Sequence, residues 1–300
     1  MRITQRAVAQ TALQGLNRNL AEVGRLNQQL TSGKLVSKPS DSPTGVNRAM
    51  QIRQDQAATV QYARNVSDAQ GRLETTDSAL GTVIEQVRRV QTLTLRAANE
   101  GAMSESSRTA IATEMRSIRE SLIGVANTTI DGQPVFGGVT TGALAYNADG
   151  TYAGIGGTGT VPVVPQMRRI SANEEVRVDV TGPEAFGDPA GGDLFALVAS
   201  IADDVVGDTD ALPGHIASLD GAMDRLLNAI SGVGARATRI ETAAQVNTDR
   251  QLQLKGQLAG VEDIDLPKTI MELNMVQTSY QAALSATAKI IQPTLVDFLA

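Results

Sequence analysis

The chain has 300 residues, enough for two domains or three small ones, and 42% of them are apolar. It has no cysteine and one histidine, His215, which excludes disulfides and Cys-ligated metals and leaves a His-based zinc site without a second ligand. Only 3% of the residues are aromatic, and such a composition favours thin helical packing over a thick globular core.

The net charge of −6 is spread unevenly, with +5 over residues 1–100, −5 over 101–200 and −6 over 201–300. The basic residues lie singly among acids, so we expect no nucleic-acid binding. The alternative is that the basic and acidic ends attract each other or the unlike ends of neighbouring subunits. The first residues hold no apolar run of signal-peptide type, and no stretch approaches 18 apolar residues. We therefore expect neither a cleavable signal peptide nor a membrane span.

The N-terminal segment predicts a helix over residues 5–32. Its large apolar residues recur at spacings of three and four, which places them along one stripe of a helix: Leu13, Leu16, Leu20, Val23, Leu26 and Leu30. Gly33 is expected to end this helix. Residues 34–43, rich in Ser, Asp and Pro, are expected to form a loop.

A second, very long helix is expected over residues 44–99 and a third over 104–127, with Ser104 as its N-cap. In the second helix, valines and leucines recur every seven residues in two heptad positions: Val66, Leu73, Leu80 and Val87, then Val83 and Val90. This repeat is typical of a coiled-coil or bundle helix. Ordinary core packing is the expected role of both helices.

Residues 131–193 have a different character and predict a small β-rich domain. Glycine is dense, proline recurs, and short period-two alternations occur at Val161–Val163 and Val176–Val180. Residues 154–159 match G-x-G-x-x-G. A dinucleotide-binding loop would need a helix immediately afterwards, where Pro162 and Pro165 stand, so we expect a turn between strands instead.

Helices are expected to return near residue 193. One apolar register runs through residues 216–261. A break at residues 262–265 precedes Pro267, which suits the first turn of a new helix. That last helix, over residues 268–299, carries its own apolar stripe, including Ile270, Leu273, Tyr280, Leu284 and Ile291.

The polar clusters have simple interpretations. Residues 262–265 lack the ligand periodicity of a calcium-binding loop and are expected to be a solvated helix break and N-cap. The aspartates of 203–210 are expected to lie in a surface loop, and His215 to cap a helix or be exposed. Arg88 and Arg89 either belong to a solvated face or form a charged seam against a neighbouring subunit. We therefore expect no metal, no cofactor and no catalytic residue.

The expected fold is mainly α with a small β insertion: a long antiparallel coiled coil or helical bundle built from both termini, with a central β-rich domain. We expect terminal coiled-coil arms at 1–43 and 263–300, a bundle domain at 44–130 and 194–262, and the β-rich domain at 131–193. The arms have only each other within the chain, so we expect them to be disordered in the monomer and to order on assembly. The expected self-assembly residues are Leu13, Leu16, Leu20, Val23, Leu30, Ile270, Leu273, Tyr280, Leu284 and Ile291.

Several motifs at both ends resemble the flagellin superfamily, and within it the hook-associated subunits of the hook–filament junction. They are, in chain order, Leu30–Lys34 (LTSGK), Pro39–Pro43 (PSDSP), Asp77–Leu80 (DSAL), Phe136–Gly138, Glu262–Leu266 (EDIDL), Tyr280–Leu284 and Leu295–Leu299 (LVDFL). Ser42 and Pro267 depart from the pattern of the family, and the middle of the chain matches it only loosely.

The resemblance implies a structural, non-enzymatic role in motility. Such a subunit is exported by the flagellar type III apparatus, is extracellular, and lies between hook-associated protein 1 and flagellin, with copies of itself in a ring. A flagellar export chaperone would bind the C-terminal arm. The alternatives are a flagellin-type filament subunit and, through Arg89, Leu93 and Glu114, a ligand of an immune receptor.

Overall fold

The computed structural model describes residues 2–99, 104–140, 142–156, 158, 162–188 and 192–291; the side chains of residues 2–6, 8, 9 and 289–291 lie outside the description. The chain divides into two compact units. Unit 1 comprises residues 1–58 and 251–300, and unit 2 comprises residues 59–250. Each unit is described by itself below.

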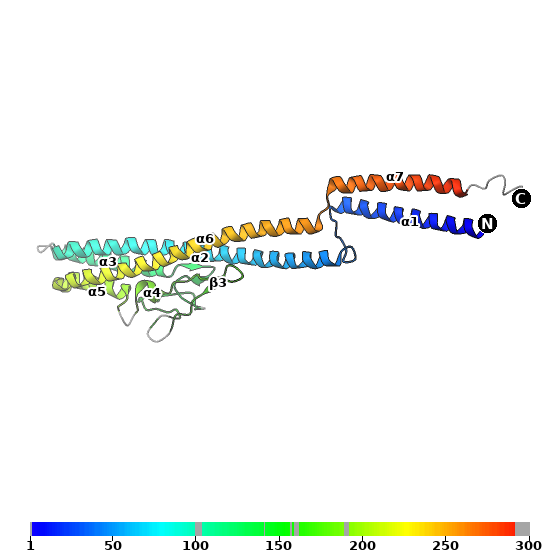
Figure 1. Cartoon of the computed structure of the whole chain (residues 1–300). Coiled ribbons are helices and arrows are strands. Elements are labelled where there is room, and N and C mark those ends of the chain that lie inside the picture. The colour runs from blue at the N-terminus through cyan, green and yellow to red at the C-terminus, as the bar shows by residue number, and fades with distance from the viewer. Residues whose placement is uncertain are drawn as a thin grey trace. The chain divides into compact units, whose positions relative to one another are not determined.

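Helices dominate both ends of the chain (Figure 1). They are α1 (Arg2–Ser32), α2 (Pro43–Asn99), α3 (Glu105–Ala126), α4 (Gly182–Phe186), α5 (Leu194–Gly207), α6 (Leu212–Glu262) and α7 (Leu266–Ile291), with a 3-10 turn η1 (Thr209–Ala211). The expected fold class, mainly helical with a small central region of short strands, is confirmed. Within the described part of the chain, no helix has the length and continuous apolar character that crossing a membrane requires.

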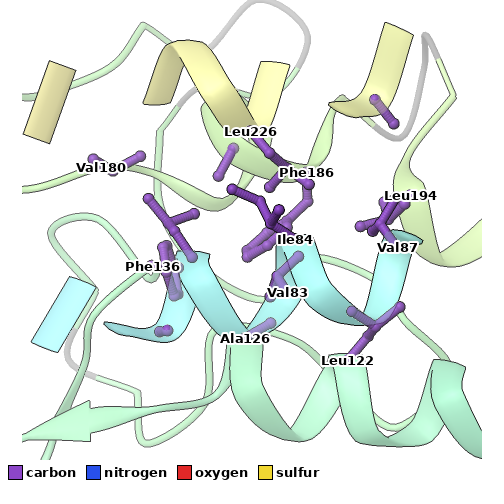
Figure 2. Close-up of a cluster of buried hydrophobic side chains, with 14 of the residues drawn as sticks. Val83, Ile84, Val87, Leu122, Ala126, Phe136, Val180, Phe186, Leu194 and Leu226 are labelled. Carbon is purple, nitrogen blue, oxygen red and sulfur yellow. The ribbon is translucent and has the colours of Figure 1, made fainter. Parts of the chain in front are cut away.

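The core of unit 2 forms where α2, α3, α5 and α6 meet the inserted segment. The heptad residues Val83, Val87 and Val90 are fully buried, as the seven-residue repeat indicates. Figure 2 shows Val83, Ile84 and Val87 of α2 facing Leu122 of α3, Phe136 and Phe186 of the insertion, and Leu226 of α6. These helices therefore pack as an ordinary bundle core.

The insertion between α3 and α5 is less regular than expected. Its strands are short and form two antiparallel hairpins: β1 (Thr129–Ile130) with β2 (Gln133–Pro134), and β3 (Met167–Arg169) with β4 (Glu175–Arg177). Of the alternating segment Val176–Val180, only Val176 and Arg177 belong to a strand, β4. Val161 lies outside the described residues, and no strand occurs at 162–166. The aromatic cluster of Phe136, Tyr146, Tyr152, Phe186 and Phe195 packs this segment instead.

Several predicted helix boundaries are confirmed by their local chemistry. Gly33 follows α1 with a φ of 68°, the left-handed conformation that glycine adopts at a helix C-terminus. The Ser104 side chain accepts a hydrogen bond from the Ser107 amide at the start of α3. The Asp265 carboxylate accepts one from the Lys268 amide at the start of α7. In the described part of 154–159, Gly156 is in a turn with a φ of 96°, and no helix follows at 162–166.

Candidate assembly surface

The arm of unit 1 is a pair of helices, α1 and α7, that lie side by side (Figure 1). On α1, the predicted apolar stripe divides into two heptad positions. Leu16, Val23 and Leu30 are half-buried, whereas Leu13 and Leu20 are each 53% exposed. Only one of the two positions is therefore covered within the chain.

The same division occurs on α7. Leu273 and Tyr280, seven residues apart, are half-buried, and Thr287 continues this position with 7% exposure. Ile270 and Leu284 lie on the uncovered side, 47% and 44% exposed. Ile291 ends the helix, and its side chain lies outside the description. Both helices thus present apolar residues that the described part of unit 1 leaves about half exposed.

Sequence reasoning missed other members of this surface. Met271 and Met275, one helical turn apart on α7, are 66% and 64% exposed. Leu26, in contrast, belongs to the predicted stripe of α1 but is not part of the exposed surface, because it is 1% exposed. The signal for the methionines was their spacing of four, which places them together but off the main stripe.

Unit 1 has little core of its own. In its described part, the buried apolar side chains are Leu26, Ala49, Ile52 and Leu254, whereas the contiguous core cluster contains only residues between 66 and 243. Among the side chains of unit 1 that the structure describes, ten large apolar ones are exposed: Leu13, Leu20, Leu35, Met50, Leu252, Leu266, Ile270, Met271, Met275 and Leu284. Two helices that bury this little apolar area are marginally stable alone.

A group of ion pairs joins the two breaks at the base of the arms. The Lys34 ammonium lies 2.6 Å from Asp263 and 3.4 Å from Glu262, and Arg53 of α2 lies 2.8 Å from Glu262. The Leu35 amide also donates a hydrogen bond of 2.6 Å to the Glu262 carbonyl. The hydrogen bond with Asp263 raises the pKa of Lys34. We call Lys34, Arg53, Glu262 and Asp263 the clasp.

The clasp corrects one prediction. The Glu262 side chain is 6% exposed rather than solvated, because two cations and the loop after α1 cover it. A buried carboxylate needs such partners, because removing an unpaired ion from water costs roughly several kcal/mol. No local sequence pattern connects Lys34 with residues so distant in the chain.

Beside the clasp, a pocket of about 450 Å³ opens between the end of α1, the loop after it and the start of α2. Its lining includes Arg25, Leu35, Val36, Lys38 and Asp41. We call it the loop pocket. Hydrogen bonds from the backbone of Lys38 and Ser37 lower the pKa of Asp41.

The other predicted polar residues are engaged within unit 2. Asp203 and Asp204 belong to α5 and not to a loop, because that helix continues to Gly207. Asp203 pairs with Arg116 at 2.8 Å, and Asp204 lies 2.6 Å from His215, which neither caps a helix nor is fully exposed. Arg89 pairs with Glu114 at 2.6 Å, while Arg88 is exposed. Among the described residues, no three His, Cys, Asp or Glu side chains gather as metal ligands do.

Comparisons with known proteins agree with this arrangement. Sequence profiles of the bacterial flagellin N-terminal and C-terminal helical regions match residues 3–141 and 216–299. Flagellar hook-associated protein 3 of Salmonella typhimurium is 26% identical over 94% of this chain and 95% of its own length; that of Escherichia coli is 25% identical over 95% and 96%. The crystal structure of Bacillus cereus FlgL, at 22% identity and a TM-score of 0.59, covers 70% of this chain and 99% of that chain.

Proposed function

Because the chain belongs to the flagellin superfamily and is a homologue of flagellar hook-associated protein 3, we propose that it joins the flagellar hook to the flagellin filament. The role is structural and not enzymatic. The subunit acts after export to the cell exterior. Hook-associated protein 1 lies on one side of it, flagellin on the other, and copies of itself complete a ring.

The uncovered side of the α1–α7 pair is the observation that supports this role. Leu13 and Leu20 on α1 and Ile270 and Leu284 on α7 are exposed at heptad spacing. Burying apolar surface contributes roughly 25 cal/mol of stability per Å². The exposed apolar residues therefore stabilise the structure only when another helix covers them. Helices of neighbouring subunits, with the same pattern, are suitable partners.

The arms are also the segment that a cytoplasmic export chaperone would hold before assembly. A chaperone bound to α7 would cover Met271 and Met275, whose flexible side chains adapt to different partners. In this proposal the arms are disordered in the free subunit and order on assembly. Hydrogen exchange that is fast over residues 266–288 in the monomer and slow in the assembled flagellum is the expected result.

A deletion strain tests the junction role. Cells without this chain are expected to build hooks, to release flagellin into the medium and to lack filaments, and the wild-type chain supplied in trans restores them. The alternative is a filament subunit, which the flagellin profiles at both ends favour. Purified protein that grows long filaments from seeds would contradict the junction role and support that alternative.

A further inference from the structure

Hydrogen bonds among the lining residues fix the shape of the loop pocket. The Gln29 amide group donates to the Leu35 carbonyl at 3.1 Å. The Asp41 carboxylate accepts from the amides of Ser37 and Lys38, at 3.1 and 2.9 Å. In the folded arm the backbone of the loop is thus fixed, as a binding site requires.

The pocket combines an apolar wall with an available cation. Leu35, 49% exposed, lies on the wall with Val36 and Val261. Arg25 is paired with Glu22 and the Asp41 carboxylate is engaged by the loop, but the Lys38 ammonium forms no ion pair within the described part of the chain. An acidic side chain with a hydrocarbon stem fits this chemistry.

The two units carry opposite net charge. Unit 1 contains 11 Lys or Arg and 8 Asp or Glu residues, a net charge of +3, and unit 2 contains 15 and 24, a net charge of −9. Unit 2 also presents carboxylates that are exposed and form no ion pair in the described part of the chain, among them Glu85, Glu120 and Asp224. Unlike charges on the two units favour contacts between unit 1 of one copy and unit 2 of another.

We infer that the loop pocket receives a carboxylate side chain from unit 2 of a second copy of this chain, with Lys38 as its counter-ion. The inference rests on the proposed ring of subunits and names a contact within it. It gives the charged loop a role distinct from that of the apolar arms: the arms provide buried area, and the pocket fixes the register of neighbouring copies.

Carbodiimide cross-linking tests the contact directly, because this reagent joins an ammonium and a carboxylate only where they touch. The chain has five lysines, at positions 34, 38, 255, 268 and 289, so the linked peptides are readily assigned. Equal amounts of ¹⁵N-labelled and unlabelled full-length chain are mixed, concentrated until they associate, cross-linked, and separated into monomer and assembled fractions.

In the assembled fraction, we expect Lys38 linked to an acidic residue of 59–250 in peptides that combine the two isotopes. Lys34 is the internal control, because its contact with Asp263 predicts a same-isotope link in the assembled fraction. Assembled protein with the Lys34 link but no mixed-isotope Lys38 link overturns the pocket contact and leaves the proposed junction role intact. Lys38 linked only within its own chain, or the absence of any assembled fraction, also overturns it.

Charge reversal gives an independent measurement. Lys38→Glu is expected to raise the concentration for half-assembly about three- to tenfold, while Lys38→Arg changes it less than about twofold. Lys38 is exposed on a loop, so both variants should keep the wild-type circular dichroism. Equal assembly of Lys38→Glu and wild type would contradict the inference.

Discussion

Lys34 and Asp263 are 229 positions apart in the chain, yet the Lys34 ammonium lies 2.6 Å from the Asp263 carboxylate. A backbone bridge pairs the same two residues, and the Ile264 amide donates to the Gly33 carbonyl at 3.2 Å. The two chain breaks below α1 and α7 are therefore one structural element. Its charges fix where the arms begin.

Glu262→Gln is expected to weaken this element. The buried Glu262 carboxylate faces both Arg53 and Lys34, so its neutralisation leaves two cations with less compensation. The expected loss is about 1.5–3 kcal/mol of local stability, the usual range for a hydrogen bond to a charged group. Hydrogen exchange of residues 30–35 and 258–266 measures it.

Asp263→Asn is the matched control. The Asp263 side chain is 46% exposed, and an exposed ion pair contributes up to about 1 kcal/mol. Exchange in the same segments should change little. If Asp263→Asn has the larger effect, burial of Glu262 is not what stabilises the clasp.

Leu20→Asp and Leu284→Asp are expected to abolish incorporation into the flagellum without unfolding the free subunit. Both side chains are already in water in the monomer, at 53% and 44% exposure, so a charge there costs little until a partner helix must cover it. The measurements are motility of the complemented deletion strain and circular dichroism of the purified variant.

Gln14→Glu provides the control for added charge, because Gln14 is exposed on the same helix and stands at neither three- nor four-residue spacing from Leu13 or Leu20. Val23→Asp should differ in another way, since Val23 is half-buried and its replacement should also weaken the α1–α7 pair once the arms have ordered. Motile cells carrying Leu20→Asp would show that the exposed heptad position is not an assembly surface.

The helices were predictable from the sequence because their signals are local. Apolar spacing predicted α1 and α7, the Ser104 cap predicted the start of α3, and Gly33 predicted the end of α1. The clasp was not predictable, because the partners of Glu262 come from α2 and from the loop after α1, and no periodicity encodes a pair so distant in sequence. The prediction of a solvated break at residues 262–265 rested on their charge alone.

The strands of the insertion are shorter than predicted, also because their length depends on residues that are distant in the sequence. Alternation at Val176–Val180 indicates a buried face, and Val176, Val178 and Val180 are all buried. The alternation therefore predicted correctly which side of the segment is buried. A strand extends only as far as a partner offers backbone hydrogen bonds, and β3 offers them to three residues.

Arg72→Met is expected to leave stability unchanged or to raise it by about 1–2 kcal/mol. Arg72 on α2 is 5% exposed, and its Nε and Nη2 have no hydrogen-bond partner among the residues that the structure describes. Burial, followed by nearby Arg168, lowers the pKa of Arg72. A buried charge without a partner is often replaced by an apolar side chain at no cost. Urea unfolding measures the difference, with exposed Arg64→Met as the control.

Asp68 forms an ion pair with Arg168 and none with Arg72 in the described part of the chain. It pairs with Arg168 at 2.7 Å and lies one helical turn from Arg72. Arg168→Gln frees the carboxylate to pair with Arg72. Asp68→Asn removes it from both arginines and should cost more stability. Equal losses in the two variants would show that Arg72 does not compete for Asp68.

Alkaline pH is expected to destabilise unit 2 through Tyr152. Burial raises the pKa of Tyr152 to about 12, from an ordinary value of 10.0, and its hydroxyl donates to the Phe136 carbonyl at 3.2 Å. Between these two values the unfolded chain loses the proton and the folded chain keeps it. The free energy of unfolding is therefore full below pH 10 and falls as the pH rises towards 12.

Tyr152→Phe separates the two contributions of that hydroxyl. At pH 8 the variant should lose about 0.5–1.5 kcal/mol, the net value of one hydrogen bond. Above pH 10 its stability should fall less steeply than that of wild type, because one proton no longer differs between the folded and unfolded states. Tyr146→Phe tests the aromatic cluster without loss of a hydrogen bond, since the buried Tyr146 hydroxyl has no hydrogen-bond partner in the described part of the chain. If the pH profiles of Tyr152→Phe and wild type run parallel above pH 10, Tyr152 does not titrate with unfolding.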